Sequence, residues 1–211
     1  MKKKEIRYEH KPSTKEYLLA LARFPCYLKL LEAREEPYLP LLNWLIAKGK
    51  ELLDDNLKLP TIKELSSEIH IPTDKIPKYL KTIYDNIYEM NSIEPNKFKM
   101  NGQKLCNCSF EYIGCYASFN LGLDFIPRIG EVFQFDFVKP QCGGYNFHVK
   151  KIYHEIINDE QTIFISLGSE RNDYLELLKE KAYLKHWISL SDYCGKTENI
   201  KEELVKMFDN L

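Results

Sequence analysis

Apolar residues recur every three to four positions from Ser13 to about Asn91, which is the spacing of one face of an α-helix. Ser13 followed by Glu16 has the form of a capping box, in which the hydroxyl and the carboxylate each accept a backbone N–H of the other residue. A helix is therefore predicted to begin at this point and to end before Pro25. A later one-sided helix is predicted from Leu41, Leu42, Leu45, Ile46, Leu52 and Leu53.

Beyond Gly102 the apolar and polar positions alternate, which is the period of a β-strand. Strands are predicted in 106–112, 133–137, 145–153 and 162–167, with turn residues in 127–130, 139–144 and 158–160. Helical spacing returns in 173–190 and again in 198–208. The sequence thus predicts an α+β protein with a helical domain in 1–95. A β-rich domain follows in 104–211, built from a small antiparallel sheet or partly closed barrel with C-terminal helices.

The most informative stretch lies between Leu59 and Tyr84. Thr61 followed by Glu64 is a second capping box, and the helix that it opens must be short because Ile71-Pro72 cannot comfortably extend it. Thr73 offers a new N-cap for a helix whose apolar face is Ile76, Leu80, Ile83 and Ile87. Two short helices are therefore predicted to meet at a tight corner.

This stretch resembles the helix-turn-helix of bacterial DNA-binding regulators, winged-helix proteins included. The resemblance lies in the pattern of Leu65, Ser66, Ile69, Ile71, Ile76 and Tyr79. Ser66 occupies the position where the two helices cross and a bulky side chain would push them apart. His70 occupies the turn position that is usually glycine, where a left-handed backbone costs free energy.

In such proteins the helix after the turn enters the major groove with its first turns towards the bases. The resemblance therefore implies a DNA-contacting face made of Thr73, Asp74, Lys75, Lys78, Lys81 and Thr82. The three lysines would contact phosphates, and the two threonines would contact the groove.

Charge limits how strongly this face can bind. Lys and Arg number 30 against 31 Asp and Glu, a net charge of -1, so the chain has no bulk attraction to nucleic acid. Residues 1–50 nevertheless hold eleven Lys/Arg and six Glu, partly in a tail with Lys2, Lys3, Lys4 and Arg7. With Lys11 and Lys15, that tail is either a solvated end of the chain or an arm that contacts phosphates. Strong affinity for double-stranded DNA would need this tail, a homodimer that doubles the contacts, or both.

The second half of the chain contains cysteines and histidines, residue types that often bind metals or act in catalysis, but their spacing fits no such site. Cys106 and Cys108 are one residue closer than the paired ligands of structural zinc sites, and no second pair follows, so buried thiols are the better interpretation. Cys142 has no positioned base beside it, and His148 and His154 alternate with lysines as rim residues do. Phosphate-binding loops, dinucleotide fingerprints and nucleophile elbows are missing from the sequence. We therefore expect no catalysis, no metal and no cofactor.

An aromatic row in the predicted sheet has two interpretations. It comprises Phe133, Phe135, Phe137, Tyr145 and Phe147. Exposed, the row could stack single-stranded bases as small barrels do; buried, it would be part of the core. The sheet could instead pair edge to edge with another subunit or form a pocket for a small effector.

No run approaches the ~20 apolar residues of a membrane span, and the charged start of the chain is unlike a secretion signal. We expect a cytoplasmic protein that does not enter membranes. The leading hypothesis is a transcriptional regulator or mobile-element accessory factor that binds DNA through the helix-turn-helix. The alternative is a protein-interaction adaptor that uses the same helices as a scaffold and binds no DNA. The sequence does not identify a small-molecule effector.

Overall fold

The computed structural model describes residues 10–54, 56–157, 160–169, 173–195 and 203–204. The chain divides into two compact units, 1–169 and 170–211. The helices and the sheet that the sequence assigns to separate domains share the first unit and one hydrophobic core. The step from helices to strands in 95–104 is thus a change of secondary structure inside one unit, and the boundary between units follows Ser169.

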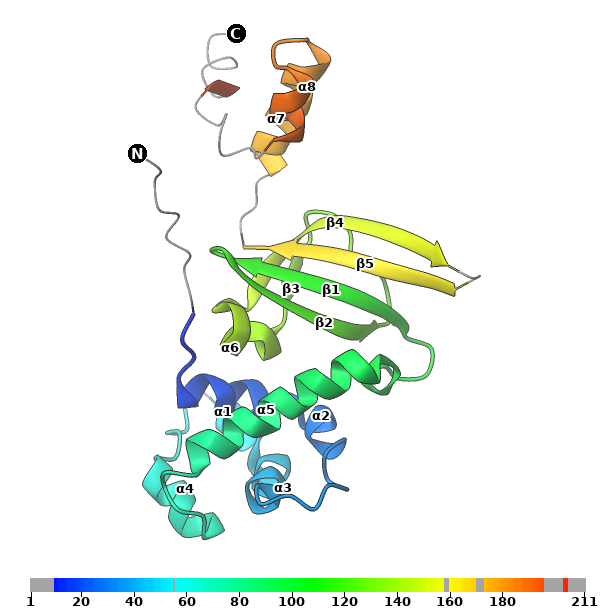
Figure 1. Ribbon diagram of the computed structural model, residues 1–211. Coiled ribbons are helices and arrows are strands. Elements are labelled where there is room, and N and C mark those ends of the chain that lie inside the picture. Colours follow the sequence, from blue (N-terminus) through cyan, green and yellow to red (C-terminus); the bar gives the residue numbers. More distant parts are fainter. Residues whose placement is uncertain (1–9, 55, 158–159, 170–172, 196–202, 205–211) are drawn as a thin grey trace. The chain divides into compact units, whose positions relative to one another are not determined.

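The helices of the first unit form a layer beneath the sheet, with α5 running along it (Figure 1). They are α1 Thr14–Ala22, α2 Pro25–Lys29, α3 Leu39–Lys48, α4 Ile62–Ile69, α5 Ile76–Ile93 and the short α6 Lys139–Cys142. One-turn 3₁₀ helices lie at η1 Glu51–Leu53, η2 Pro95–Phe98 and η3 Asp136–Val138. The capping box predicted at Ser13 is present at the start of α1.

The strands are β1 Lys104–Tyr112, β2 Cys115–Leu123, β3 Val132–Gln134, β4 Asn146–Ile157 and β5 Glu160–Gly168, in the order β2-β1-β5-β4-β3. The sheet curls, so that residues of β2 and β3, its two edges, line one cavity. The α+β class and the partly closed barrel are confirmed. The antiparallel assignment is wrong at the centre, because β5 pairs in parallel with β1 from Cys106↔Ile163 to Glu111↔Gly168. The direction of β5 is set by its antiparallel hairpin with β4, and in that direction β5 runs parallel to β1.

Two segments differ from the predicted strands. The sequence pattern did not predict β2, which follows β1 through a two-residue turn at Ile113 and Gly114, both with positive φ (48° and 78°). Such turns favour Asn-Gly, and an isoleucine gives no signal for one. The strand predicted in 133–137 is also too long: β3 ends at Gln134, and the chain then coils through η3 and α6. This coil directs the consecutive side chains of Phe137 and Val138 into the core, which a strand could not do with one of its faces exposed.

Aromatic rings join the helical layer to the sheet. Phe137 lies 4.9 Å from Tyr84 of α5, 5.6 Å from Tyr27 of α2 and 5.1 Å from Phe119 of β2, measured between ring centroids. The Tyr84 hydroxyl donates a buried hydrogen bond of 2.8 Å to the Phe137 carbonyl, and burial raises the pKa of Tyr84 above its usual range. Helices and sheet are thereby parts of one packed interior.

The C-terminal part of α5 also attaches to the exposed edge of the sheet. Asn91, 2% exposed, accepts the backbone N–H of Asn120 in β2 at Oδ1 and donates from Nδ2 to the backbone carbonyl of the same residue, both at 2.8 Å. One side chain thus satisfies two backbone groups that an edge strand otherwise leaves unpaired.

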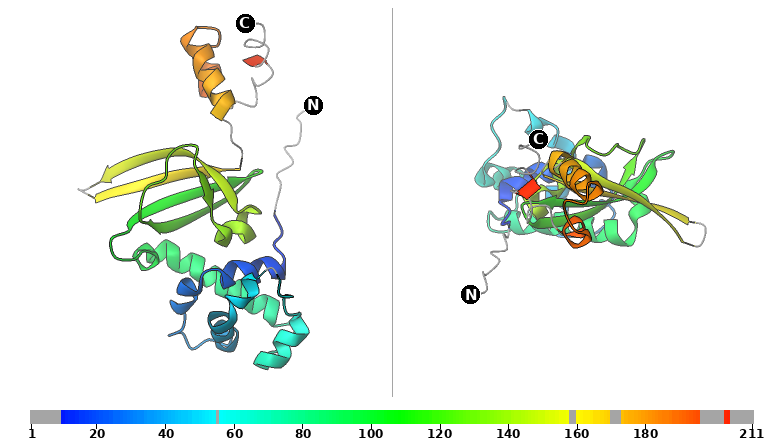
Figure 2. Two further views of the ribbon diagram at one scale, coloured as in Figure 1. Left: turned by 180° about the vertical axis from the view of Figure 1, so that it is seen from behind. Right: turned by 90° about the horizontal axis from the view of Figure 1, so that it is seen from above.

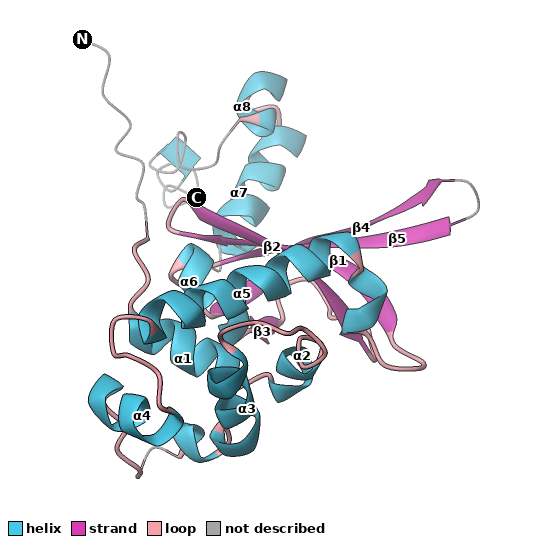
Figure 3. Ribbon diagram, turned by 60° about the horizontal axis from the view of Figure 1, so that its bottom comes forward, coloured by secondary structure: helices cyan, strands magenta, loops and turns pink. Residues whose placement is uncertain are grey.

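Strands β4 and β5 continue as a hairpin beyond the end of β1 (Figures 2 and 3). Their pairing reaches Ile157↔Glu160, whereas β5 pairs with β1 only from Ile163 onwards.

The second unit has a small core of its own, made of Leu178, Ala182, Ile188 and Leu204. The helix predicted over 173–190 is interrupted: α7 spans Asp173–Leu184, and α8, Leu190–Cys194, starts at a new capping box of Ser189 and Asp192. His186 between them has a left-handed backbone (φ 58°). Most of the helix predicted in 198–208 lies outside the described residues.

Candidate nucleic-acid interface

The candidate interface is built on the α4–α5 corner, by which we mean residues 61–85. Its first helix begins as the sequence predicts. The Thr61 hydroxyl accepts the Glu64 N–H at 3.2 Å, and the Thr61 N–H donates to the Glu64 carboxylate at 2.6 Å. These bonds from Thr61 hold the pKa of Glu64 below its usual range. The capping box therefore gives α4 a defined first residue.

The turn between the two helices depends on His70 and Ser66. His70 has a left-handed backbone (φ 56°, ψ 35°), as its position in the sequence predicts. The hydroxyl of Ser66, one turn earlier in α4, donates a 2.6 Å hydrogen bond to the carbonyl of Ile71. The small residue expected at the crossing thus leaves room for α5 and also bonds the chain that leaves the turn.

The second helix begins later than predicted. Lys75, not Thr73, is the N-cap of α5, and no side chain caps this end. The N–H of Lys75 instead bonds the Pro72 carbonyl at 3.0 Å, and Pro77 sits in the first turn, where its missing N–H costs nothing. Residues 73–75 therefore form a tight turn ahead of the helix.

Burial decides which face of α5 points outward. Ile76, Leu80 and Ile83 are at most 1% exposed and pack in the main core, together with Leu65 of α4. The residues that the resemblance implies are all exposed: Thr73, Asp74, Lys75, Lys78, Lys81 and Thr82. All six are therefore accessible to solvent.

Two of the six, Lys81 and Thr82, have hydrogen-bond partners within α5. Lys81 forms an ion pair with Asp85, one turn further along, and the hydrogen bond to that carboxylate raises the pKa of Lys81. The Thr82 hydroxyl donates to the Lys78 carbonyl at 3.0 Å. Asp74 is a carboxylate beside Lys75. Lys75 and Lys78 form no ion pair within the described ranges, so they are the cations with their charge most available. Asp85 is the functional neighbour that the sequence interpretation missed, although its spacing of four from Lys81 is the signal for such a pair.

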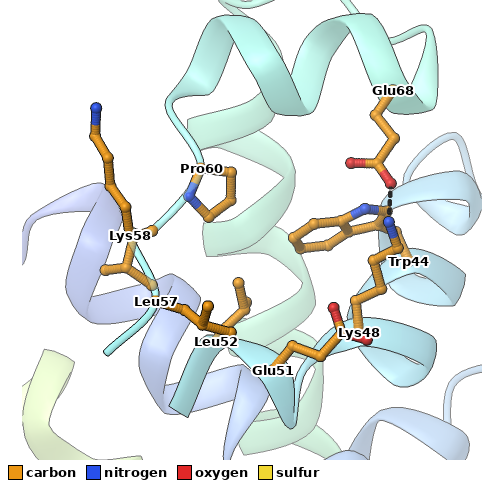
Figure 4. A pocket seen from close by; sticks show the side chains of 9 residues that line it. Trp44, Lys48, Glu51, Leu52, Leu57, Lys58, Pro60 and Glu68 are labelled. Carbon is orange, nitrogen blue, oxygen red and sulfur yellow. Dashed lines mark hydrogen bonds and ion pairs between the residues drawn. The ribbon is translucent and has the colours of Figure 1, made fainter. Parts of the chain in front are cut away.

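An open cavity of about 230 Å³ lies between α3, η1, the loop before α4 and α4 itself (Figure 4). Trp44 and Lys48 of α3 form one wall, and Leu57 and Pro60 of the loop before α4 form the opposite wall. Lys48 pairs with Glu68 of α4 across the rim, and this bond lowers the pKa of the Glu68 carboxyl. The pair connects α3 to the α4–α5 corner. The cavity wall contains neither a cysteine nor a histidine.

The cysteines are part of the core. Cys106, Cys108 and Cys142 are fully buried, and burial raises the pKa of each thiol, the reverse of what a nucleophile or a metal ligand needs. Across the described part of the chain, no group of three or more His, Cys, Asp or Glu side chains is placed to hold a metal ion.

The aromatic row is core rather than a binding surface. Phe135, Phe137 and Phe147 are at most 5% exposed, and Phe133 packs against them, while Tyr145 alone of the five is classed as exposed. The row therefore offers no continuous exposed ring surface on which bases could stack.

Of the predicted basic tail, Lys2, Lys3, Lys4 and Arg7 lie outside the described residues. The tail prediction is wrong for Lys15, which lies in the first turn of α1 behind the Ser13 cap, whereas Lys11 precedes that helix. None of the described helices combines the length and the apolarity that crossing a bilayer requires. Comparison of the chain with protein-family models, curated proteins and solved structures gave no match.

Proposed function

We propose that the α4–α5 corner is a helix-turn-helix through which the protein binds double-stranded DNA, as a transcriptional regulator or mobile-element accessory factor. One observation carries the proposal: the buried side of α5 is apolar, and its opposite side presents Lys75 and Lys78 in the first turns. In a helix-turn-helix these turns lie closest to the phosphates and base edges.

The expected chemistry is mainly electrostatic. Lys75 and Lys78 neutralise phosphates and release counterions, and Thr73 offers a hydroxyl at the start of the same surface. Lys81 contributes less, because Asp85 already partners its ammonium group. With few phosphate contacts per corner, affinity is modest unless a homodimer supplies a second corner.

The test is titration of a labelled duplex at about 50 and about 200 mM salt. We expect binding that weakens with salt, and a Lys75→Ala/Lys78→Ala/Lys81→Ala variant that binds about tenfold or more weakly with a shallower salt dependence. The matched control removes three other exposed lysines, Lys29, Lys50 and Lys97, and should bind as the unaltered protein does. Equal weakening in both triple variants would mean that net charge, not this surface, drives binding.

A second candidate is the adaptor without DNA binding. It is favoured by apolar side chains exposed near the start of α4: Leu57 is 55% exposed and Ile62 37%. No binding to any duplex at low salt would reject the DNA proposal in favour of this one.

A further inference from the structure

A second exposed surface lies on the sheet, on the face opposite to the core. We call it the outer face and define it by Asn107 and Ser109 of β1, Phe164 and Ser166 of β5, and Lys151 and Tyr153 of β4. These residues alternate along their strands with buried ones such as Cys106, Cys108 and Ile165. Register places Asn107, Phe164 and Tyr153 in one row across three strands, since Phe164 pairs with both of the others.

The centre of the outer face is a pair of stacked rings. Tyr153 and Phe164 lie 4.8 Å apart between centroids with planes 4° from parallel, and Tyr153 remains 40% exposed. The ammonium group of Lys151 lies 5.2 Å from the Tyr153 centroid. Neither ring is part of the main core or of the aromatic contacts there. The pair therefore places apolar ring surface and a cation together on an otherwise polar face.

A polar cavity of about 500 Å³ adjoins this pair. It shares Asn107 with the outer face, and Thr162, which also lines it, lies two residues before Phe164 on the same strand. The rest of its lining is rich in amides and in lysines: Asn96, Lys99, Gln103, Lys104, Leu105, Asn120, Gln161 and Ile163. Lys99 and Lys104 are its charged groups, and no carboxylate lines it.

We infer that the outer face and this cavity bind single-stranded nucleic acid. Unpaired bases stack on exposed aromatic rings whatever their sequence, and lysines beside the rings neutralise the phosphates that connect the bases. Asn107 uses one amide hydrogen in its 3.1 Å bond to Asn120, so its other amide hydrogen and its Oδ1 are available to the edge of an unpaired base. A duplex fits this surface poorly, because its bases already stack on one another. The site is separate from the α4–α5 corner and does not depend on it.

The experiment measures fluorescence anisotropy of a labelled thymidine oligonucleotide of about ten nucleotides, with a uridine oligonucleotide of the same length in parallel. We expect Tyr153→Ala and Phe164→Ala each to weaken binding about tenfold, and Tyr153→Phe to preserve it because the ring remains. Thermal unfolding of each variant checks that the fold is intact.

The chain offers a closely matched control in Tyr145. Its ring is also 40% exposed, and it also has a lysine ammonium, that of Lys139, 5.2 Å from its centroid, but it belongs to neither the outer face nor the cavity. Tyr145→Ala should leave oligonucleotide binding unchanged. The triple lysine variant of α5 should also retain it, which separates this inference from the proposed duplex binding.

Absence of binding to both oligonucleotides at low salt would overturn the inference. So would folded Tyr153→Ala and Phe164→Ala variants that bind as well as the unaltered protein, or an equal loss in Tyr145→Ala. A protein that binds the oligonucleotides but no duplex would support this inference and reject the DNA proposal for the corner.

Discussion

His70 turns the chain between α4 and α5 with a backbone that glycine adopts more readily than histidine. We expect His70→Gly to raise the free energy of unfolding by up to about 1 kcal/mol, because the left-handed conformation no longer crowds a Cβ atom. Urea unfolding measures the change. His70→Ala keeps a Cβ atom and should give no comparable gain; an equal gain would mean that the imidazole, not the backbone, destabilises the turn.

The thiols provide a second test at the scale of single residues. Cys26 and Cys194 are exposed, whereas Cys106, Cys108 and Cys142 are buried and have raised pKa values. Brief treatment of the folded protein with iodoacetamide should therefore modify the two exposed thiols first, as mass spectrometry of the digested protein would show. The buried thiols should react only after unfolding. Modification of Cys108 as fast as Cys26 would contradict its place in the core.

At the scale of the element, an acidic residue of α5 lowers the net positive charge on the face that bears its lysines. Asp85 pairs with Lys81, so Asp85→Asn should free that ammonium group and strengthen duplex binding roughly two- to fivefold. Glu89→Gln makes the same charge change one turn further along α5 and is the control, expected to have less effect. Equal effects in both variants would indicate general electrostatics. Lys81→Ala should likewise cost less affinity than Lys75→Ala or Lys78→Ala.

The start of α4 has a pH dependence with a definite sign. Hydrogen bonds from Thr61 lower the pKa of Glu64 in the folded chain, so its carboxylate stabilises α4 above the ordinary pKa of 4.5. That stabilisation is lost as the pH falls through the lowered value, because protonation removes the negative charge that strengthens the hydrogen bonds from Thr61. The difference in unfolding free energy between the unaltered protein and Glu64→Gln, measured by urea unfolding, should be constant above about pH 5 and shrink in acid. A difference that stays unchanged in acid would show that the carboxylate charge does not stabilise the cap.

At the scale of the whole molecule, helices and sheet of the first unit are expected to unfold together, because they share one core. Asn91→Ala removes the side chain that bonds two backbone groups of Asn120, which should cost about 2 kcal/mol. In a Trp187→Phe background the fluorescence of Trp44 in α3 reports the helical layer alone. We expect Asn91→Ala to shift this signal and the circular dichroism to the same lower urea concentration.

Independent helical and β domains would behave differently. The Trp44 signal would then keep its midpoint in the Asn91→Ala variant. A second transition in the circular dichroism is not diagnostic, because the separate unit 170–211 also contains helices. Ser92→Ala, at an exposed position next to Asn91, should leave both midpoints nearly unchanged and serves as the control.

The sequence by itself determined features that depend on a few neighbouring residues. Ser13 with Glu16 and Thr61 with Glu64 mark helix starts because both partners of the capping box lie within one turn. The apolar spacing of Ile76, Leu80 and Ile83 sets the outward face of α5 because a helix repeats every 3.6 residues. The left-handed turn at His70 belongs to the same class of local signals.

Only the tertiary structure decided what depends on distant partners. Nothing near β1 in the chain shows that β5 will lie beside it in parallel, because strand pairing joins residues more than fifty positions apart. Phe137 and Phe164 are the same residue type in segments of similar pattern, yet one is buried against α5 and the other stacks on Tyr153 on the outer face. Alternation identifies the two faces of a strand, but which face is buried is set by the elements that pack against it.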